Sequence, residues 1–396
     1  MKIGIYDQHI HRMGGGEQYI CTIAEFLSKE HTVELLTTNP ADKKILCDKL
    51  NLDLSRVKLI ILPSDIESDN SEYTKQYDLF INGSYYSKLI NYAPVGIIII
   101  FFPILNKHNI PKFIKHIIYT ILHLLFKNKS EPFNNVFLKR LYLRYLNEQY
   151  YQSHDEYLSS YKTIISISKY TQLWIKKNSS KNSIILYSPV NIKEGNLDKK
   201  QNILISVGRF FNTDHNKKQL EMIKLYKRMY DANLSIHNFE YHLCGGTQKE
   251  KIHMDYYDAC FNEAKGYPIY LHPDISYDEL NALYMHSKIF WHATGLNENI
   301  NKNPDKFEHF GITTVEAMSA GVVPVVIGKA GQKETVTDGL DGYLWTSENE
   351  CIYQTLKLIS DDSLLSKMSK QAIISSQKYS KHNFGVNLNE ILSKII

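Results

Sequence analysis

The sequence predicts an α/β protein with two doubly wound parallel sheets, and three observations support this fold class. Short β-rich runs alternate with segments of helical periodicity along the whole chain, the pattern of parallel sheets covered by helices. A polar linker at 191–201 separates two sets of such runs. The length of 396 residues suits two or three domains. Two Rossmann-like domains that face each other across a central cleft are the simplest architecture.

The strands are predicted from β-rich runs bounded by polar or turn-forming residues. The first set lies at 2–6, 32–38, 57–62, 78–82, 95–102, 163–168 and 183–187. The second set lies at 202–208, 240–245, 268–272, 288–293 and 322–327. We therefore predict an N-terminal domain over 1–190, a C-terminal domain over 191–375, and a last helix over 376–396 that crosses back to the N-terminal domain.

Composition excludes several classes of protein. With 43% hydrophobic and 22% charged residues the chain is an ordinary globular protein, and a net charge of +4 is too small for tight nucleic-acid binding. Five scattered cysteines without a Cys-x-x-Cys pair predict a reducing compartment and no zinc site. The start lacks the zones of a signal peptide, and Pro103 interrupts the longest apolar run, 95–105, which is too short to cross a bilayer. We expect a cytoplasmic protein.

A glycine-rich loop follows the first predicted strand and reads Gly14-Gly15-Gly16-Glu17. Glycine lets a backbone approach a ligand closely, and the free N–H groups of the helix that starts here favour an anion such as phosphate. The third glycine of a dinucleotide fingerprint is absent, so a turn that only connects strand to helix is the alternative. His9 and His11 flank the loop without further metal ligands, and we expect them to line the cleft.

Two glutamates, Glu308 and Glu316, surround a predicted helix start. We expect Thr313 or Thr314 to cap this helix and Gly321 to end it in a left-handed conformation. Both carboxylates then face the cleft beside the free amides, where a diphosphate and sugar hydroxyls would find partners. Those amides belong to Phe310, Gly311, Ile312 and Thr313. The alternative is that Glu316 only favours the helix dipole and that Glu308 is solvated.

The stretch from Glu308 to Glu316, followed by AMSAGVVPVV and GKAGQKETVTDGLDGYL, resembles the donor-site signature of retaining nucleotide-sugar glycosyltransferases of family 4. These group 1 glycosyltransferases have the GT-B fold. The glycine loop, Arg209 at the end of SVGR, Lys217 with the run after it, and 277–293 match further motifs in the family's order. The resemblance therefore covers most of the chain.

The resemblance implies a role for each matching residue. Arg209 and Lys217 would hold the donor diphosphate and neutralise the leaving group. Glu308 would contact the transferred sugar, and Glu316 the ribose hydroxyls. The phosphates would also be bound by the amides of Gly15, Gly16, Phe310, Gly311, Ile312 and Thr313. The resemblance further implies no cofactor and no required metal, because the basic pair replaces the divalent ion, and the sequence has no Asp-x-Asp triplet.

The chain departs from the family in the spacing of its basic pair. Arg209 and Lys217 are eight positions apart, a longer link than the family usually shows. Lys218 is therefore an alternative partner, although Lys217 brings Met222 and Ile223 into register.

A second departure concerns the strand predicted at 95–102. Many members of the family end it with a histidine that contacts the donor sugar, where this chain has Phe101 and Phe102. His9, His11 or His108 could compensate. We expect His272, His286 and His292 to be core or cleft histidines rather than ligands.

The acceptor is expected near the segment 107–147, which has eight basic residues and one acid. Its part 112–126 reads as a basic amphipathic helix, which would lie in the interface of an anionic membrane or pack on the sheet as an ordinary domain helix. In the first case the protein is peripheral on the inner face of the membrane, and its acceptor is a lipid-linked glycan.

Together these features predict a retaining, metal-independent hexosyltransferase of polysaccharide biosynthesis. It would transfer a hexose from a UDP- or GDP-linked donor to a hydroxyl group of the acceptor. Its expected partners are the nucleotide-sugar donor and a glycan or glycosylated acceptor, and no nucleic acid. The HFGI sequence after Glu308 is similar to the corresponding sequence in enzymes that transfer mannose onto lipid-linked oligosaccharides. The alternatives are a GT-B hydrolase or phosphorylase of sugar phosphates and a non-catalytic nucleotide-sugar-binding subunit. A glycosidase is disfavoured, because nothing in the sequence resembles two carboxylates across a scissile bond.

Overall fold

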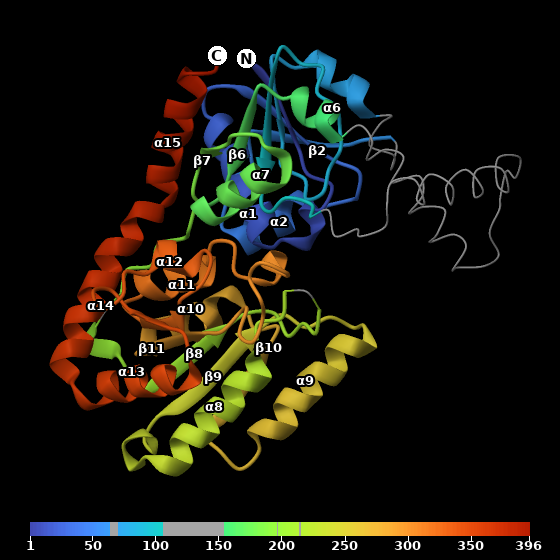
Figure 1. The fold of residues 1–396 in the computed structure, drawn as a ribbon. Coiled ribbons are helices and arrows are strands. Elements are labelled where there is room, and N and C mark those ends of the chain that lie inside the picture. Colours follow the sequence, from blue (N-terminus) through green and yellow to red (C-terminus); the bar gives the residue numbers. More distant parts are fainter. Residues whose placement is uncertain (64–69, 106–153, 196, 214) are drawn as a thin grey trace, which may run out of the picture.

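The structure is a computed structural model that describes residues 1–63, 70–105, 154–195, 197–213 and 215–396. It consists of two lobes, each built on one parallel sheet (Figure 1). The strand order is β3-β2-β1-β4-β5-β6-β7 in the first sheet and β10-β9-β8-β11-β12-β13 in the second. All pairings between these strands are parallel, which confirms the predicted fold class.

The first lobe has its strands close to the predicted runs. They are β1 Lys2–Tyr6, β2 Thr32–Thr37, β3 Val57–Ile61, β4 Leu79–Asn82, β5 Val95–Ile100, β6 Thr163–Ser166 and β7 Ile184–Ile185. Its helices are α1 Gly15–Leu27, α2 Lys43–Leu50, α6 His154–Ser159 and α7 Lys169–Ser179. The β7 strand is shorter than its run, because only Ile184 and Ile185 pair with β6.

The second lobe contains one strand that the sequence analysis did not predict, β13 Tyr343–Trp345 at the sheet edge. The others are β8 Ile203–Val207, β9 Glu240–Gly245, β10 Ile269–Pro273, β11 Ile289–His292 and β12 Val323–Ile327. The helices are α8 Gln219–Ala232, α9 Lys251–Ala264, α10 Tyr277–His286, α11 Ile312–Ser319, α12 Gln332–Thr335, α13 Glu348–Ser360, α14 Asp362–Ser376 and α15 Lys381–Ser393.

Both sheets are buried on two faces, as the near-continuous apolar strands require. In the first lobe Ile3 and Ile97 share a core with α1, α2 and α15, whereas Phe80 and Ile98 face the core that includes α6 and α7. In the second lobe alternate strand residues face α8, α9 and α13 on one side and α10 and α11 on the other. The strand ends of both sheets are thereby held rigidly at the cleft.

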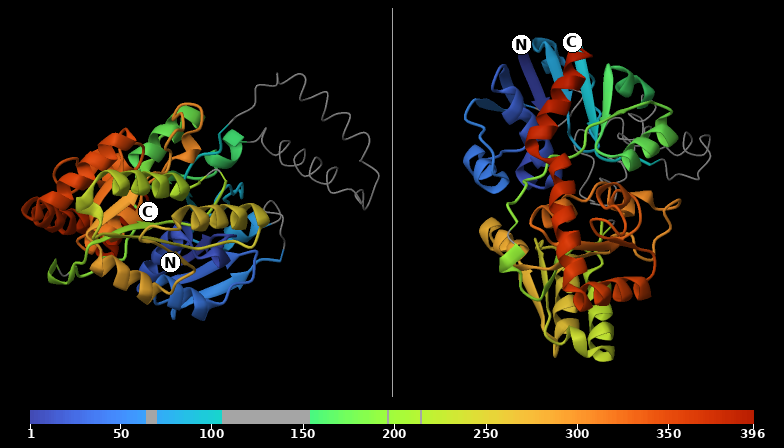
Figure 2. Two further views of the ribbon diagram at one scale, coloured as in Figure 1. Left: turned by 90° about the horizontal axis from the view of Figure 1, so that it is seen from below. Right: turned by 90° about the vertical axis from the view of Figure 1, so that its left-hand side faces the viewer.

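The last helix, α15, leaves the second lobe and runs along the first (Figures 1 and 2). It packs against α1, where a Cβ on Gly385 would lie 2.2 Å from the Phe26 ring. Both chain ends consequently lie at the far end of the first lobe (Figure 2).

The lobes also touch directly at the cleft. Phe102 after β5 packs with Tyr170 and Phe307 in a small apolar cluster. The Glu334 carboxylate accepts hydrogen bonds from the Lys169 and Tyr170 amides, both at 2.8 Å, at the N-terminus of α7. This contact suits the helix dipole and holds α12 against the first lobe.

The basic segment 107–147 and its expected helix 112–126 lie outside the described residues, so their membrane role stays a prediction. In the described part of the chain, no helix is both long and apolar enough to span a membrane. All five cysteines are free.

Candidate active site

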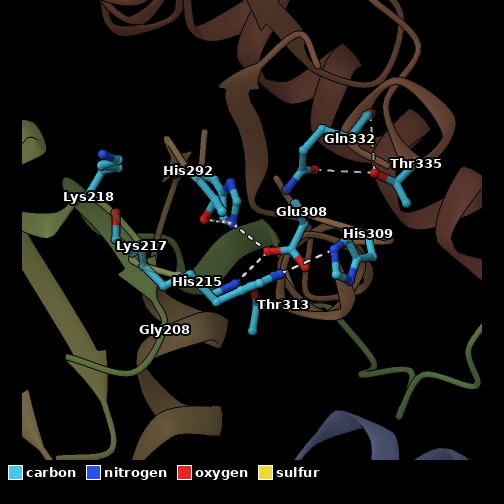
Figure 3. A network of polar contacts seen from close by, with 12 residues as sticks. Gly208, His215, Lys217, Lys218, His292, Glu308, His309, Thr313, Gln332 and Thr335 are labelled. Atoms are coloured by element: carbon cyan, nitrogen blue, oxygen red, sulfur yellow. Dashed lines mark hydrogen bonds and ion pairs between the residues drawn. The ribbon is translucent and has the colours of Figure 1, made fainter. Parts of the chain in front are cut away.

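The predicted residues Lys217 and Glu308 meet at the carboxyl ends of β8 and β11, where they form an ion pair (Figure 3). Lys217 Nζ lies 2.5 Å from Glu308 Oε2, and both side chains are nearly buried. His292 Nε2 lies 3.1 Å from the same oxygen. Burial raises the pKa of the Glu308 carboxyl, but Lys217 and His292 outweigh it and hold that pKa well below its usual value. Glu308 is therefore ionised at neutral pH.

The loop between β8 and α8 explains why Lys217 rather than Lys218 faces Glu308. The Asn216 side chain accepts from the Lys218 amide at 2.6 Å and donates to the Phe211 carbonyl at 2.6 Å, which closes a turn before α8. Lys218 then adopts the left-handed conformation, with φ of 61°. Its ammonium lies 3.5 Å from Glu298, on the other side of the loop. The geometry thus separates the two neighbouring lysines.

Arg209 starts the same loop, and its guanidinium lies over the Phe211 ring at 4.4 Å. The carboxylates of Glu17 in the first lobe and Glu308 in the second both act on its charge. Arg209 is exposed, so its donors are available to a ligand in the cleft. Both basic residues of the proposed pair therefore interact electrostatically with the Glu308 carboxylate.

The glycine loop of the first lobe meets the start of α11 in the second. A Cβ on Gly15 would lie 2.7 Å from Ile312 Cδ1, and a Cβ on Gly16 would lie 3.6 Å from the Phe101 ring. Gly14 is the N-cap of α1, and its amide donates to Glu17 at 2.6 Å. The first amides of a helix have no carbonyl partner within it, so two helix N-termini lie close together at this point.

The predicted threonine cap of α11 is wrong. Gly311 is the N-cap, with φ of 104°, and Thr313 and Thr314 lie within the helix. Only glycine adopts this conformation readily, and the turn lets the chain pass Gln332, whose side chain would lie 3.1 Å from a Cβ at this position. The amides of Phe310, Gly311, Ile312 and Thr313 thus surround a glycine turn, and Gly321 ends the segment with the expected positive φ, 75°.

Glu316 lies in the second turn of α11. Its carboxylate accepts from the Tyr284 hydroxyl at 3.3 Å. Burial raises its pKa, and the nearby Lys193 opposes that rise. Lys193 comes from the linker and also lies over the rings of Tyr277 and Tyr284. Lys193 was not predicted as a site residue, because no spacing pattern relates the linker to α11.

Three histidines around Glu308 were not predicted as a group. His215 Nε2 lies 3.4 Å from His309 Nε2, and the His309 ring stacks on Phe102 of the first lobe with centroids 4.2 Å apart. His292, expected as a core or cleft histidine, ends β11 and is 3% exposed. A search for polar residues near strand ends would have found His292. His215 and His309 come into contact only in the folded chain, because they lie in loops far apart in the sequence.

Phe101 and Phe102 follow β5, at the place where the family resemblance predicts a histidine. Phe101 packs edge-to-face on Tyr19 beside the glycine loop. His9 Nε2 lies 3.0 Å from the Gln8 side chain, and its amide donates to Asp7. His11 is exposed. His108 lies outside the described residues.

Substitution of Gly245 is expected to distort the Arg209 loop. A Cβ there would lie 2.0 Å from the Gly208 carbonyl oxygen, and this backbone cannot move away without breaking the hydrogen bond from the Gly208 amide to Cys244. Gly245→Ala should lower the free energy of unfolding by about 2 kcal/mol or more, measured by chemical denaturation. At Gly246 the nearest atom to a Cβ is 3.5 Å away, so Gly246→Ala should change the free energy of unfolding by less than about 0.5 kcal/mol. Equal effects of the two variants would contradict this account.

The histidines also predict a pH dependence of stability. Burial, with Lys217 nearby, lowers the pKa of His215 to about 4, whereas in the unfolded chain it is about 6.5. Between these values the unfolded state binds more protons, so stability falls as the pH falls from about 6.5 to about 4.

His215→Gln should therefore flatten the plot of unfolding free energy against pH in this window, by up to about 1 kcal/mol per pH unit. The exposed His382 supplies a control variant, His382→Gln. Subtraction of the curves cancels groups such as Asp7, whose pKa burial and Glu17 raise to about 8 and which acts in the opposite direction. An unchanged slope would contradict the prediction.

Comparison with known proteins identifies part of the chain. Residues 188–375, which contain the ion pair and α11, match the family described as glycosyl transferases group 1. This region is similar to the group 1 glycosyl transferases. The group 1 region begins just after β7 and ends within α14, so it includes the whole second sheet. Membership of family 4 in particular stays a prediction.

Curated relatives are similar over shorter stretches. The chain is 26% identical over 237 residues to a GDP-Man:Man(3)GlcNAc(2)-PP-Dol alpha-1,2-mannosyltransferase of Dictyostelium discoideum, covering 57% of this chain and 44% of that protein. It is 37% identical over 93 residues to an alpha-1,3/1,6-mannosyltransferase of the same organism, covering 22% of each. The matches thus span less than half the length of either relative.

Solved structures match the fold of this chain over nearly its whole length. A sucrose-phosphate synthase from Thermosynechococcus elongatus matches with a TM-score of 0.68 at 13% identity, covering 100% of this chain and 98% of that one. An Anabaena protein, Alr3699/HepE in complex with UDP and glucose, matches with a TM-score of 0.64 at 14% identity, covering 99% of each. These neighbours support the GT-B fold.

Proposed function

We propose that the protein is a retaining glycosyltransferase that moves a hexose from a nucleoside diphosphate sugar to a hydroxyl acceptor. The observation that carries the proposal is that Lys217 and Arg209 both interact with Glu308, which lies three positions before the glycine cap of α11. A diphosphate there gains two cations and unpaired helix amides, and Gly15 of the other lobe brings a second helix N-terminus to it.

The proposed chemistry is a same-face displacement. As the bond between the sugar carbon and the phosphate oxygen breaks, negative charge grows on the departing diphosphate. Arg209 and Lys217 stabilise this charge, and the leaving phosphate accepts the proton of the attacking hydroxyl. Glu308 orients the sugar, and Glu316 holds the ribose. The cationic pair supplies the charge that a divalent ion supplies elsewhere, so we propose that no metal is required.

GDP-mannose is the first donor to test, because two of the relatives are mannosyltransferases and one of them is named for GDP-Man. UDP-glucose is the second, because the Anabaena neighbour is described with UDP and glucose. The relative named for a PP-Dol substrate supports a lipid-linked glycan as the acceptor. Cytoplasmic location and contact with the inner membrane face belong to the same proposal.

A thermal-shift panel of GDP, UDP and their sugars tests donor binding, because a ligand that binds only the folded state raises the melting temperature. The best donor is then incubated with and without a short glycan acceptor in EDTA, and the anomeric configuration of the product is read by NMR. We expect transfer only with an acceptor, and retention of configuration. Release of free sugar without an acceptor indicates a hydrolase, and binding without any reaction indicates a non-catalytic subunit.

A further inference from the structure

The Glu308 carboxylate is held asymmetrically by its neighbours. Lys217 and His292 both contact Oε2, at 2.5 and 3.1 Å. No hydrogen bond or ion pair within the described residues uses Oε1. If Lys217 moves to a bound diphosphate, the contact with His292 is the one that remains on Oε2 (Figure 3).

The chemistry of this contact fixes the tautomer of His292. An ionised carboxylate only accepts hydrogen bonds, so Nε2 must carry the proton. Thr294 Oγ1 lies 3.2 Å from the same nitrogen and is its second neighbour. Burial lowers the pKa of His292, so the ring is neutral and adds no charge next to Lys217.

The other ring nitrogen, Nδ1, is buried and has no hydrogen-bond partner in the described part of the chain. A buried polar atom without a partner destabilises a fold, so stability alone does not favour histidine at this position. Such local costs are expected where a side chain serves a site. His292 is also rigidly placed, because it is the last residue of β11 and pairs with Val326 of β12.

We propose that His292 is a positioning residue that holds Glu308 Oε2 so that Oε1 faces the donor sugar, also after Lys217 has turned to the diphosphate. The inference rests on the proposed function. In this proposal the neutral imidazole holds Glu308 Oε2, which Lys217 cannot do while its ammonium group binds phosphate. Orientation of this kind should affect sugar transfer rather than nucleotide affinity, because in this proposal His292 acts only through Glu308.

Two substitutions at one position test the idea. His292→Gln keeps an N–H donor at similar reach, whereas His292→Met has a similar volume and no donor. We expect His292→Met to lower kcat by about 10- to 100-fold with the Kd of the nucleoside diphosphate unchanged, and His292→Gln to recover most of the loss. We also expect the acid limb of the kcat profile to move to higher pH in His292→Met, because Glu308 loses a hydrogen bond to its ionised form.

The outcomes separate this inference from the proposed function. If the wild-type protein transfers no sugar from any donor, the proposed function fails. If the wild type is active and His292→Met, folded by circular dichroism, matches it in kcat and pH profile, the positioning role is wrong. Equal losses in His292→Met and His292→Gln, with an unmoved acid limb, would show that the ring only fills space and would also overturn the inference.

Discussion

Replacement of Lys217 by methionine is expected to lower kcat by about 10²- to 10³-fold, the usual effect of removing one group that stabilises transition-state charge. Lys217 Nζ lies 2.5 Å from Glu308 Oε2. In the proposed reaction it turns to the diphosphate. Methionine keeps most of the apolar stem of the side chain and removes the charge together with its hydrogen-bond donors. The affinity for the nucleoside diphosphate should fall as well, which isothermal titration calorimetry measures.

The neighbouring lysine is a matched control for this experiment. Lys218 has a similarly low exposure but pairs with Glu298 and Glu221. Lys218→Met should leave kcat and nucleotide affinity within about twofold of the wild type, as for a substitution outside the site. The opposite order of effects would mean that Lys218 is the functional partner of Arg209.

Replacement of Glu308 by glutamine should also abolish most transfer, by about 10²-fold or more, but for a different reason. The carboxylate orients the sugar in our account, so kcat falls while nucleoside diphosphate affinity is kept. Loss of its charge also leaves Lys217 nearly buried without its ion-pair partner, which should lower the free energy of unfolding by about 3 kcal/mol. Transfer assays, calorimetry and chemical denaturation measure the three effects.

Glu298→Gln controls for the loss of a partly buried carboxylate. Glu298 has a similar exposure and pairs with Lys218 and Lys306, each at 3.5 Å. We expect this variant to lose stability and to keep its transfer rate. If Glu298→Gln and Glu308→Gln reduce kcat equally, the effect comes from weakened folding rather than from contact with the sugar.

The sequence predicted the parts of the structure that depend on local pattern. Twelve of the thirteen strands in the described part of the chain and the glycine turn at Gly321 follow from periodicity and from single-residue conformations. The approach of Lys217 to Glu308 was predicted only through the family resemblance, because 91 positions separate the two residues.

Other features depend on long-range packing, which no local pattern encodes. The cap of α11 was predicted wrongly because threonine is a favourable cap in general, whereas here Gly311 must pass close to Gln332. The contacts of Lys193 and His215 were missed because each joins a loop to a helix or loop far along the chain. His292 could have been singled out, since it is the next-to-last residue of the strand predicted at 288–293 and the last residue of β11.

The central claim is that Lys217 and Arg209 together stabilise a departing diphosphate in front of α11. A crystal structure of the complex with the nucleoside diphosphate of the best donor tests it most directly. The account predicts both cationic groups within hydrogen-bond distance of the phosphates, the terminal phosphate on the amides around Gly311, and Glu308 still against His292. A diphosphate bound elsewhere, with the ion pair between Lys217 and Glu308 intact, would contradict it.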